Sequence, residues 1–143
     1  MHIVIRITLP RERLSSTQSL INKGHEVVDL GPIEYKSVNY PEIAIEVSRC
    51  VRDNQNSFGI LICSTGIGMS ITANKIKGIR AANCINTYLS EHARLHNDAN
   101  ILCLGSSVVE SNYALQIVDK FLFTSFEGGK HLARVQMINN LDS

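Results

Sequence analysis

The chain has 143 residues, of which 44% are apolar and 19% charged, a composition typical of one globular domain with a substantial core. Fourteen basic and thirteen acidic residues leave a net charge of +1, which excludes proteins that bind nucleic acid or acidic membranes mainly by charge. No apolar segment approaches the ~20 residues needed to cross a bilayer, and the first apolar run is too short for a signal peptide. We therefore expect a cytoplasmic protein with a single domain over residues 1–143.

Short apolar runs alternate with helical patterns from one end of the chain to the other. The runs are rich in Ile, Val and Leu without strict polar alternation, as in strands that are covered on both faces. They are residues 3–7, 26–30, 59–63, 79–85 and 100–104. This alternation predicts an α/β fold of the doubly wound, Rossmann-like type, in which a five-stranded parallel sheet carries helices on both faces. Ligands of such folds bind outside the carboxyl ends of the strands.

The helical patterns carry start signals and apolar stripes. Residues 39–42 read Asn-Tyr-Pro-Glu, which predicts a helix start with a capping asparagine and a proline in the first turn. Apolar stripes at helical spacing predict helices over residues 69–76 and 114–122. A last helix, over about residues 130–141, is expected after a pair of glycines.

The turn after the third strand carries the strongest chemical signal. Cys63 ends the strand, and the small residues from Ser64 to Gly68 open the next helix. The unpaired N–H groups of a helix N-terminus can hold an anion, and the same field favours thiolate over thiol. Cys63 is therefore a candidate base for a carbon acid, with the turn stabilising an enediolate and the Thr65 hydroxyl sharing that task or relaying a proton. The alternative is a small buried residue that merely ends a strand.

The other cysteines and the glycine pattern predict no further chemistry. Cys50, Cys84 and Cys103 lie in or beside apolar segments without paired ligand spacing, so we expect buried reduced thiols and no metal site. Residues 66–71 lack the third glycine of a dinucleotide fingerprint and follow the third strand rather than the first. The sequence also contains no nucleotide P-loop.

Two further groups have residue types suited to a sugar phosphate. His96 is either a satisfied polar residue or the acid that opens a sugar ring, with Asn97 orienting a hydroxyl and Asp98 as a local turn residue. Lys130 and Arg134 are four residues apart on the last predicted helix. They share one face, which is either simply solvated or binds a phosphate, whereas the intervening His131 projects from another face.

Several segments together resemble the type B ribose-5-phosphate isomerase family. The likeness runs from about Gly24 to the C-terminus. The matching segments are residues 39–41, 59–71, 73–75, 78–82, 96–100 and 127–135.

The resemblance implies interconversion of ribose 5-phosphate and ribulose 5-phosphate through an enediolate, without a metal or an organic cofactor. It implies that Cys63 moves the proton between C1 and C2, that His96 assists ring opening, and that Thr65 takes part in catalysis. It also implies a homodimer or tetramer whose active sites take residues from both subunits. The implied phosphate ligands are Lys130 and Arg134, and the implied sugar-binding residues are Ser64, Gly66, Ile67, Gly68, Asn97, Tyr40 and Thr8.

The chain departs from the family pattern mainly in its ligand-binding residues. An Asp-His pair of the family is replaced by Thr8 and Leu9, and Ser107 stands where an Arg is frequent. Two alternatives follow: a related isomerase of a hexose 6-phosphate such as galactose 6-phosphate, or a sugar-phosphate-binding subunit with little turnover. The presence of both Cys63 and His96 in one chain favours the pentose phosphate.

Overall fold

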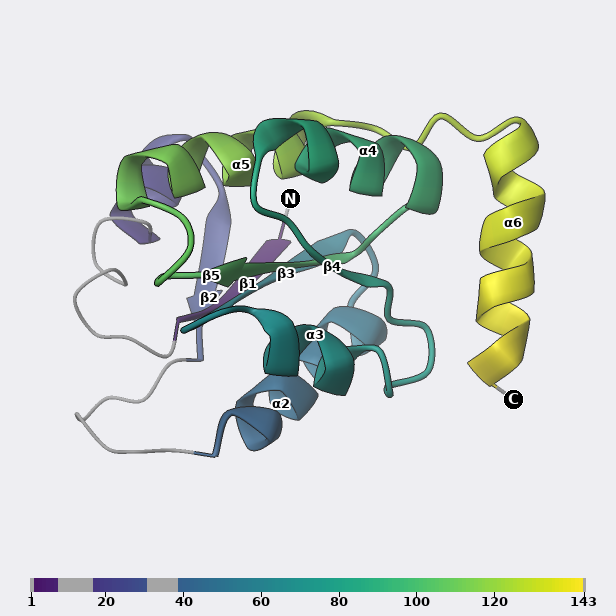
Figure 1. The fold of residues 1–143 in the computed structure, drawn as a ribbon, viewed down its shortest axis with the longest axis horizontal. Coiled ribbons are helices and arrows are strands. Elements are labelled where there is room, and N and C mark those ends of the chain that lie inside the picture. Colours follow the sequence, from purple (N-terminus) through teal and green to yellow (C-terminus); the bar gives the residue numbers. More distant parts are fainter. Residues whose placement is uncertain (1, 8–16, 31–38, 143) are drawn as a thin grey trace.

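The computed structural model of the protein describes residues 2–7, 17–30 and 39–142 and contains a parallel sheet (Figure 1). Its strand order is β2-β1-β3-β5-β4, and every neighbouring pair is parallel. The α/β class predicted from the alternating runs is confirmed. The strands are β1 (His2–Ile7), β2 (Glu26–Asp29), β3 (Ser57–Cys63), β4 (Ala81–Asn83) and β5 (Ile101–Gly105).

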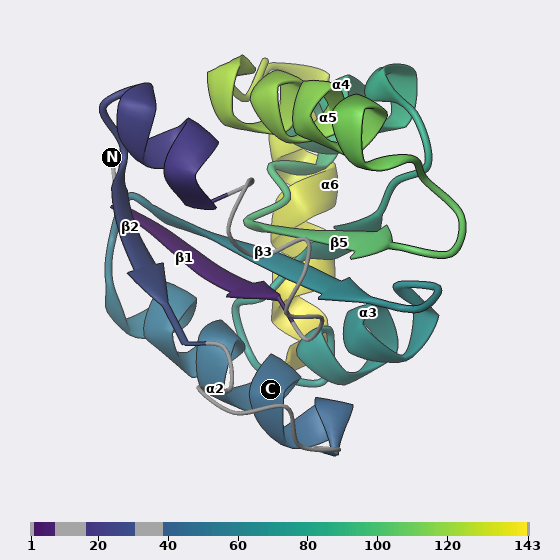
Figure 2. The ribbon, with the colours of Figure 1, turned by 90° about the vertical axis from the view of Figure 1, so that its left-hand side faces the viewer.

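Helices cover both faces of the sheet. Helices α2 (Tyr40–Asp53) and α3 (Ile67–Ala73) lie on one face, and α4 (Thr87–Asn97) and α5 (Ser111–Phe123) on the other (Figures 1 and 2). Residues 17–22 are also helical. Among the described helices, none is both long and apolar enough to span a membrane.

The central strand β3 shows why the apolar runs lack polar alternation. Ile60 and Ile62 belong to the core under α4 and α5, whereas Leu61 belongs to the core under α2 and α3. Leu61 and Ile60 are at most 1% exposed, so both faces of the strand are removed from water. This double burial positions the carboxyl end of β3, where Cys63 lies.

Two local predictions needed correction. Helix α2 begins where the sequence indicated, but the side chain of Asn39 makes no capping hydrogen bond. The predicted strand over residues 79–85 is only three residues long as β4, and Ile85 is half exposed. Asn86 then caps α4, because its side-chain oxygen accepts a hydrogen bond from the Leu89 N–H at 2.8 Å.

Helix α6 (Lys130–Asn139), followed by a 3₁₀ turn over Asn140–Asp142, stands at the edge of the molecule (Figure 1). It packs on α4, where its His131 ring contacts that of His96, and its buried residues are His131 and Val135. Its other side chains include several exposed apolar groups, which in a lone chain would face water. They are Leu132, Met137, Ile138 and, in the 3₁₀ turn, Leu141.

Candidate active site

The loop after β3 is bonded to the loop after β5. The Ser106 N–H donates to the carbonyl of Cys63 at 2.8 Å, and the Ser107 N–H donates to the carbonyl of Ser64 at 2.9 Å. The hydroxyls of Ser64 and Ser107 lie 2.9 Å apart and share a hydrogen bond. These contacts fix the backbone beside Cys63 against the loop after β5.

Gly66 directs a backbone donor at the cysteine sulfur. Its N–H donates to the Sγ of Cys63 at 3.1 Å. Gly66 has φ 79°, and a Cβ atom there would lie 2.5 Å from the Oδ1 of Asn83. Only glycine fits both constraints. A hydrogen bond donated to sulfur stabilises negative charge on it, and the half-buried Cys63 stays within reach of a ligand.

Two N–H groups of the loop are bonded within the loop itself. Fewer of its N–H groups are therefore free to bind an anion than the sequence predicted. Gly66 donates to the cysteine sulfur, and the Ile67 N–H donates to the Oγ1 of Thr65 at 3.3 Å. The Thr65 and Ile67 side chains are exposed. The role of the remaining N–H groups in binding an anion stays a prediction.

Tyr40, a predicted sugar ligand, lies against this loop. A Cβ atom on Gly68 would lie 2.5 Å from the Tyr40 ring, so the first residue of α2 rests on the first turn of α3. The Tyr40 side chain is 44% exposed. Thr8, the remaining predicted sugar ligand, lies outside the described residues.

The other cysteines differ from Cys63 in their surroundings. Burial raises the pKa of Cys84 to about 11 and raises the pKa of Cys103 further, so both stay thiols at neutral pH. Both are buried, as predicted, whereas Cys50 is only half-buried, against expectation. All four cysteines are free.

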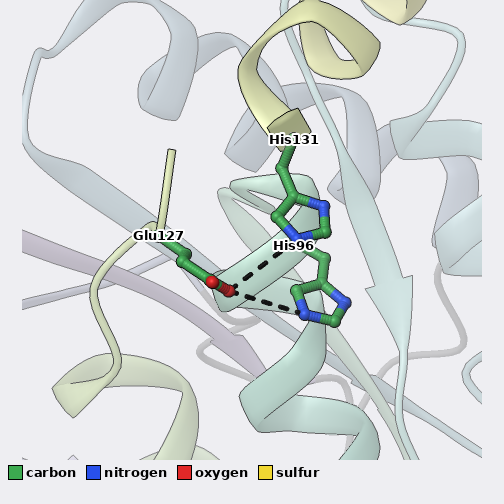
Figure 3. Close-up of side chains that lie close together, drawn as sticks. All are labelled: His96, Glu127 and His131. Carbon is green, nitrogen blue, oxygen red and sulfur yellow. Dashed lines mark ion pairs between the residues drawn. The ribbon is translucent and has the colours of Figure 1, made fainter. Parts of the chain in front are cut away.

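A second group of polar side chains lies where α4, α6 and their link meet (Figure 3). His96, in the last turn of α4, stacks on His131 with ring centroids 4.1 Å apart and planes 12° from parallel. The Nε2 atoms of both rings lie 3.7 Å from the Oε2 of Glu127. Neither Glu127 nor His131 was a predicted site residue.

Helix α6 divides its polar residues between two faces. Lys130 and Arg134 are exposed, whereas His131 is buried, which agrees with the prediction that His131 projects elsewhere. Burial lowers the pKa of His131, and the neighbouring His96 lowers it further, while Glu127 acts in the opposite direction. His131 and Val135 are the buried residues of α6, and the apolar Val135 four positions after His131 is the sequence signal that could have placed His131 on the packed face.

Arg80, which follows Ile79 in the segment before β4, supports this second group. Its guanidinium donates to the carbonyl oxygens of Asn97 at 3.0 Å and Asp98 at 2.8 Å, and to the side chain of Asn139 at 3.0 Å. Asp98 is the predicted turn residue, with φ 44°, and it also pairs with Arg94 at 2.8 Å. Arg80 therefore joins the end of α4 to the end of α6.

The two groups lie at opposite ends of the strands of the sheet. Cys63 ends β3 and pairs with Gly105, the last residue of β5. His96 lies before Ile101, the first residue of β5. The length of β5, about 13 Å, therefore separates the end of the strands near His96 from the end near Cys63. One chain therefore does not bring Cys63 and His96 together.

Comparison with known proteins supplies the family. Residues 12–138 match the family described as Ribose/Galactose Isomerase. The chain belongs to the ribose/galactose isomerase family. Ribose-5-P isomerase B of Listeria innocua is 44% identical over 86% of this chain and 83% of its own length. Ribose-5-phosphate isomerase B of Escherichia coli is 42% identical over the same shares.

Solved structures of this family have the same fold. Ribose-5-phosphate isomerase B of Clostridium thermocellum matches with a TM-score of 0.94 and 42% identity, covering 99% of this chain and 97% of its own. The enzyme of Mycoplasma genitalium, solved with bound ribulose-5-phosphate, matches with a TM-score of 0.91 and 37% identity. That match covers 99% of this chain and 95% of the other. Both groups of polar residues, around Cys63 and around His96, lie within the family match.

Proposed function

We propose that this protein is an aldose–ketose isomerase that interconverts ribose 5-phosphate and ribulose 5-phosphate, with Cys63 as the base. Family membership and relatives named ribose-5-phosphate isomerase B support the reaction. The observation that carries the role of Cys63 is the Gly66 N–H bonded to its sulfur at the carboxyl end of a parallel strand.

The chemistry is a proton transfer between neighbouring carbons. The Cys63 thiolate removes the proton from C2 of the open-chain aldose, and the electron pair moves to the aldehyde oxygen to give an enediolate. The same sulfur returns the proton to C1, while the proton of the C2 hydroxyl passes to the charged oxygen on C1, so that C2 becomes the ketone and C1 carries a hydroxyl. The Thr65 hydroxyl, exposed in the same loop, accepts the Ile67 N–H and keeps its own proton to donate to the charged oxygen. The step needs neither a metal nor an organic cofactor.

The remaining ligands come from the second group. His96 opens the sugar ring, Asn97 orients a hydroxyl, and Lys130 with Arg134 binds the phosphate. Because this group lies at the amino ends of the strands and Cys63 at a carboxyl end, each active site combines residues of two chains. The exposed apolar side chains of α6 support such an assembly, a homodimer or a pair of dimers.

Two other features refine the proposal. Buried free thiols at Cys84 and Cys103 fit the reducing cytoplasm. The family description names galactose as well as ribose, which keeps a hexose 6-phosphate as the second candidate substrate. Thr8 and Leu9, in place of the family's Asp-His pair, motivate the alternative of a binding subunit with little turnover.

The test is an isomerase assay on purified protein in the presence of a chelator. We expect ribose 5-phosphate to be converted, and Cys63→Ala to lower kcat by roughly 10²–10⁴-fold without unfolding the protein. Cys50→Ala is the matched control, because Cys50 is a half-buried free thiol on α2, outside the loop, and it should keep full activity. Turnover of hexose phosphates alone would select the second candidate. Binding of pentose phosphate without turnover would select the binding subunit.

A further inference from the structure

Three side chains of the second group have the types and spacing of metal ligands. His96, Glu127 and His131 each offer one ligand atom, and these atoms all lie within 4.8 Å of one another (Figure 3). The two Nε2 atoms are each 3.7 Å from the Oε2 of Glu127. The three residues come from three segments: the end of α4, the link before α6, and the first turn of α6.

Two imidazoles and one carboxylate form the donor set of zinc sites that keep an open fourth position. Bonds of about 2.0–2.2 Å in a tetrahedron place ligand atoms roughly 3.4 Å apart, a few tenths of an ångström less than the two distances here. The stacked rings must also turn so that both lone pairs point at one ion. His96 and Glu127, whose side chains are 39% and 57% exposed, have room to adjust around the more buried His131.

The backbone already holds the three segments together. The Glu127 N–H donates to the carbonyl of Leu95 at 3.1 Å, and the His131 N–H donates to that of Gly128 at 3.0 Å. The far end of α6 is tied to the body by the bond from Arg80 to Asn139. Ion binding therefore requires side-chain rotation rather than assembly of separate segments, which lowers its entropic cost.

Two cations lie near the cluster and bear on the choice of ion. Lys130 and Arg134 are exposed, so water and salt screen their repulsion of a cation. The charges of Lys130 and Arg134 also favour an anionic oxygen as the fourth ligand of the ion. A borderline ion that prefers imidazole nitrogen, such as Zn²⁺, fits this site better than Mg²⁺ or Ca²⁺, which prefer oxygen alone.

We propose that Zn²⁺ binds to His96, Glu127 and His131 and inhibits the enzyme. The ion occupies the Nε2 atom of His96, and the ring then has no free nitrogen there for acid–base work on the sugar. The proposed ion-binding site is inferred from the cluster alone, whereas the proposed inhibition also rests on the proposed function.

Binding is tested on the metal-free, full-length protein with Zn²⁺ by calorimetry and with Co²⁺ by visible absorption. We expect one ion per chain, and a loss of affinity of at least about tenfold in Glu127→Gln and in His131→Gln. His92→Gln is the matched control: its ring lies on the same helix, 4.9 Å from that of His96, but its Nδ1 is bonded to the Tyr88 carbonyl. Cys63→Ala controls for binding through the thiolate, and both control variants should bind as the unaltered protein does.

Unchanged Zn²⁺ affinity in His131→Gln, or loss of binding in Cys63→Ala, would overturn the site. In the activity assay, stoichiometric Zn²⁺ should suppress turnover and a chelator should restore it. A zinc-loaded protein with full activity would overturn the inhibition. A metal-free protein without any isomerase activity would instead contradict the proposed function, and the calorimetry would still decide the site.

Discussion

At the scale of single residues, Gly66 links the shape of the loop to its chemistry. Its positive φ turns the N–H toward the Cys63 sulfur, and Asn83 and the end of β5 leave no room for a side chain. The burial of Cys84 and Cys103 raises their pKa values and leaves them inert. Among the four cysteines, the contacts thus distinguish Cys63 as the one with a backbone donor on its sulfur.

Gly66→Ala tests this link. The substitution should lower the free energy of unfolding by about 1–3 kcal/mol, because alanine is strained at positive φ, and it should lower kcat by displacing the donor from Cys63. Gly24→Ala is the matched control, since Gly24 has φ 83° with no atom within 4 Å of the added Cβ. It should lose stability through the same strain and keep kcat. Denaturant unfolding and steady-state kinetics measure both effects, and an unchanged kcat in Gly66→Ala would contradict the role of the donor.

His131 provides a prediction on pH. Because burial and His96 lower its pKa in the folded protein, the unfolded chain takes up this proton first as the pH falls below about 6.5. His131 therefore contributes a loss of stability on acidification. NMR titration of the metal-free protein should give a pKa below 6.5, and Glu127→Gln should lower it further. An unchanged or higher pKa in Glu127→Gln would contradict stabilisation of the protonated ring by this carboxylate.

At the scale of the elements, the order of strands and helices followed from the sequence, but their contacts did not. The runs over residues 59–63 and 100–104 predicted the buried strands β3 and β5, since such burial follows local periodicity. The run over residues 26–30 instead forms the edge strand β2, in which Val28 is 42% exposed. The docking of α6 on α4 depends on residues about 35 positions apart in the chain, such as His96 and His131, and no local pattern encodes that distance. The opposite placement of Cys63 and His96 was available from the sequence, because one ends a predicted strand and the other precedes one.

Arg80 tests how the end of α4 is held. Arg80→Gln should destabilise the protein by about 2 kcal/mol and lower kcat/KM, since the bonds to Asn97, Asp98 and Asn139 are lost and His96 is no longer held in place. Arg52→Gln is the control, because Arg52 pairs with its exposed neighbour Asp53. It should change stability by no more than about 0.5 kcal/mol. Equal effects of the two variants in thermal unfolding would contradict the bracing role of Arg80.

At the scale of the whole molecule, the sheet separates the two groups that the proposed reaction combines. The Cys63 loop lies at the carboxyl ends of the parallel strands. His96 lies at their amino ends, together with Lys130 and Arg134 of α6. The exposed apolar residues of α6 are the surface on which we propose that a second copy packs. The family resemblance predicted shared sites, and the separation of the groups gives a physical reason for them.

The most direct measurement is complementation between two inactive variants, Cys63→Ala and His96→Asn, expressed together with different tags. A dimer with shared sites contains one intact Cys63–His96 pair when it holds one chain of each kind. With random pairing, the mixture should therefore recover about one quarter of the activity of the unaltered protein, and the purified mixed dimer about one half. A mixed dimer as inactive as its parents would contradict the composite active site.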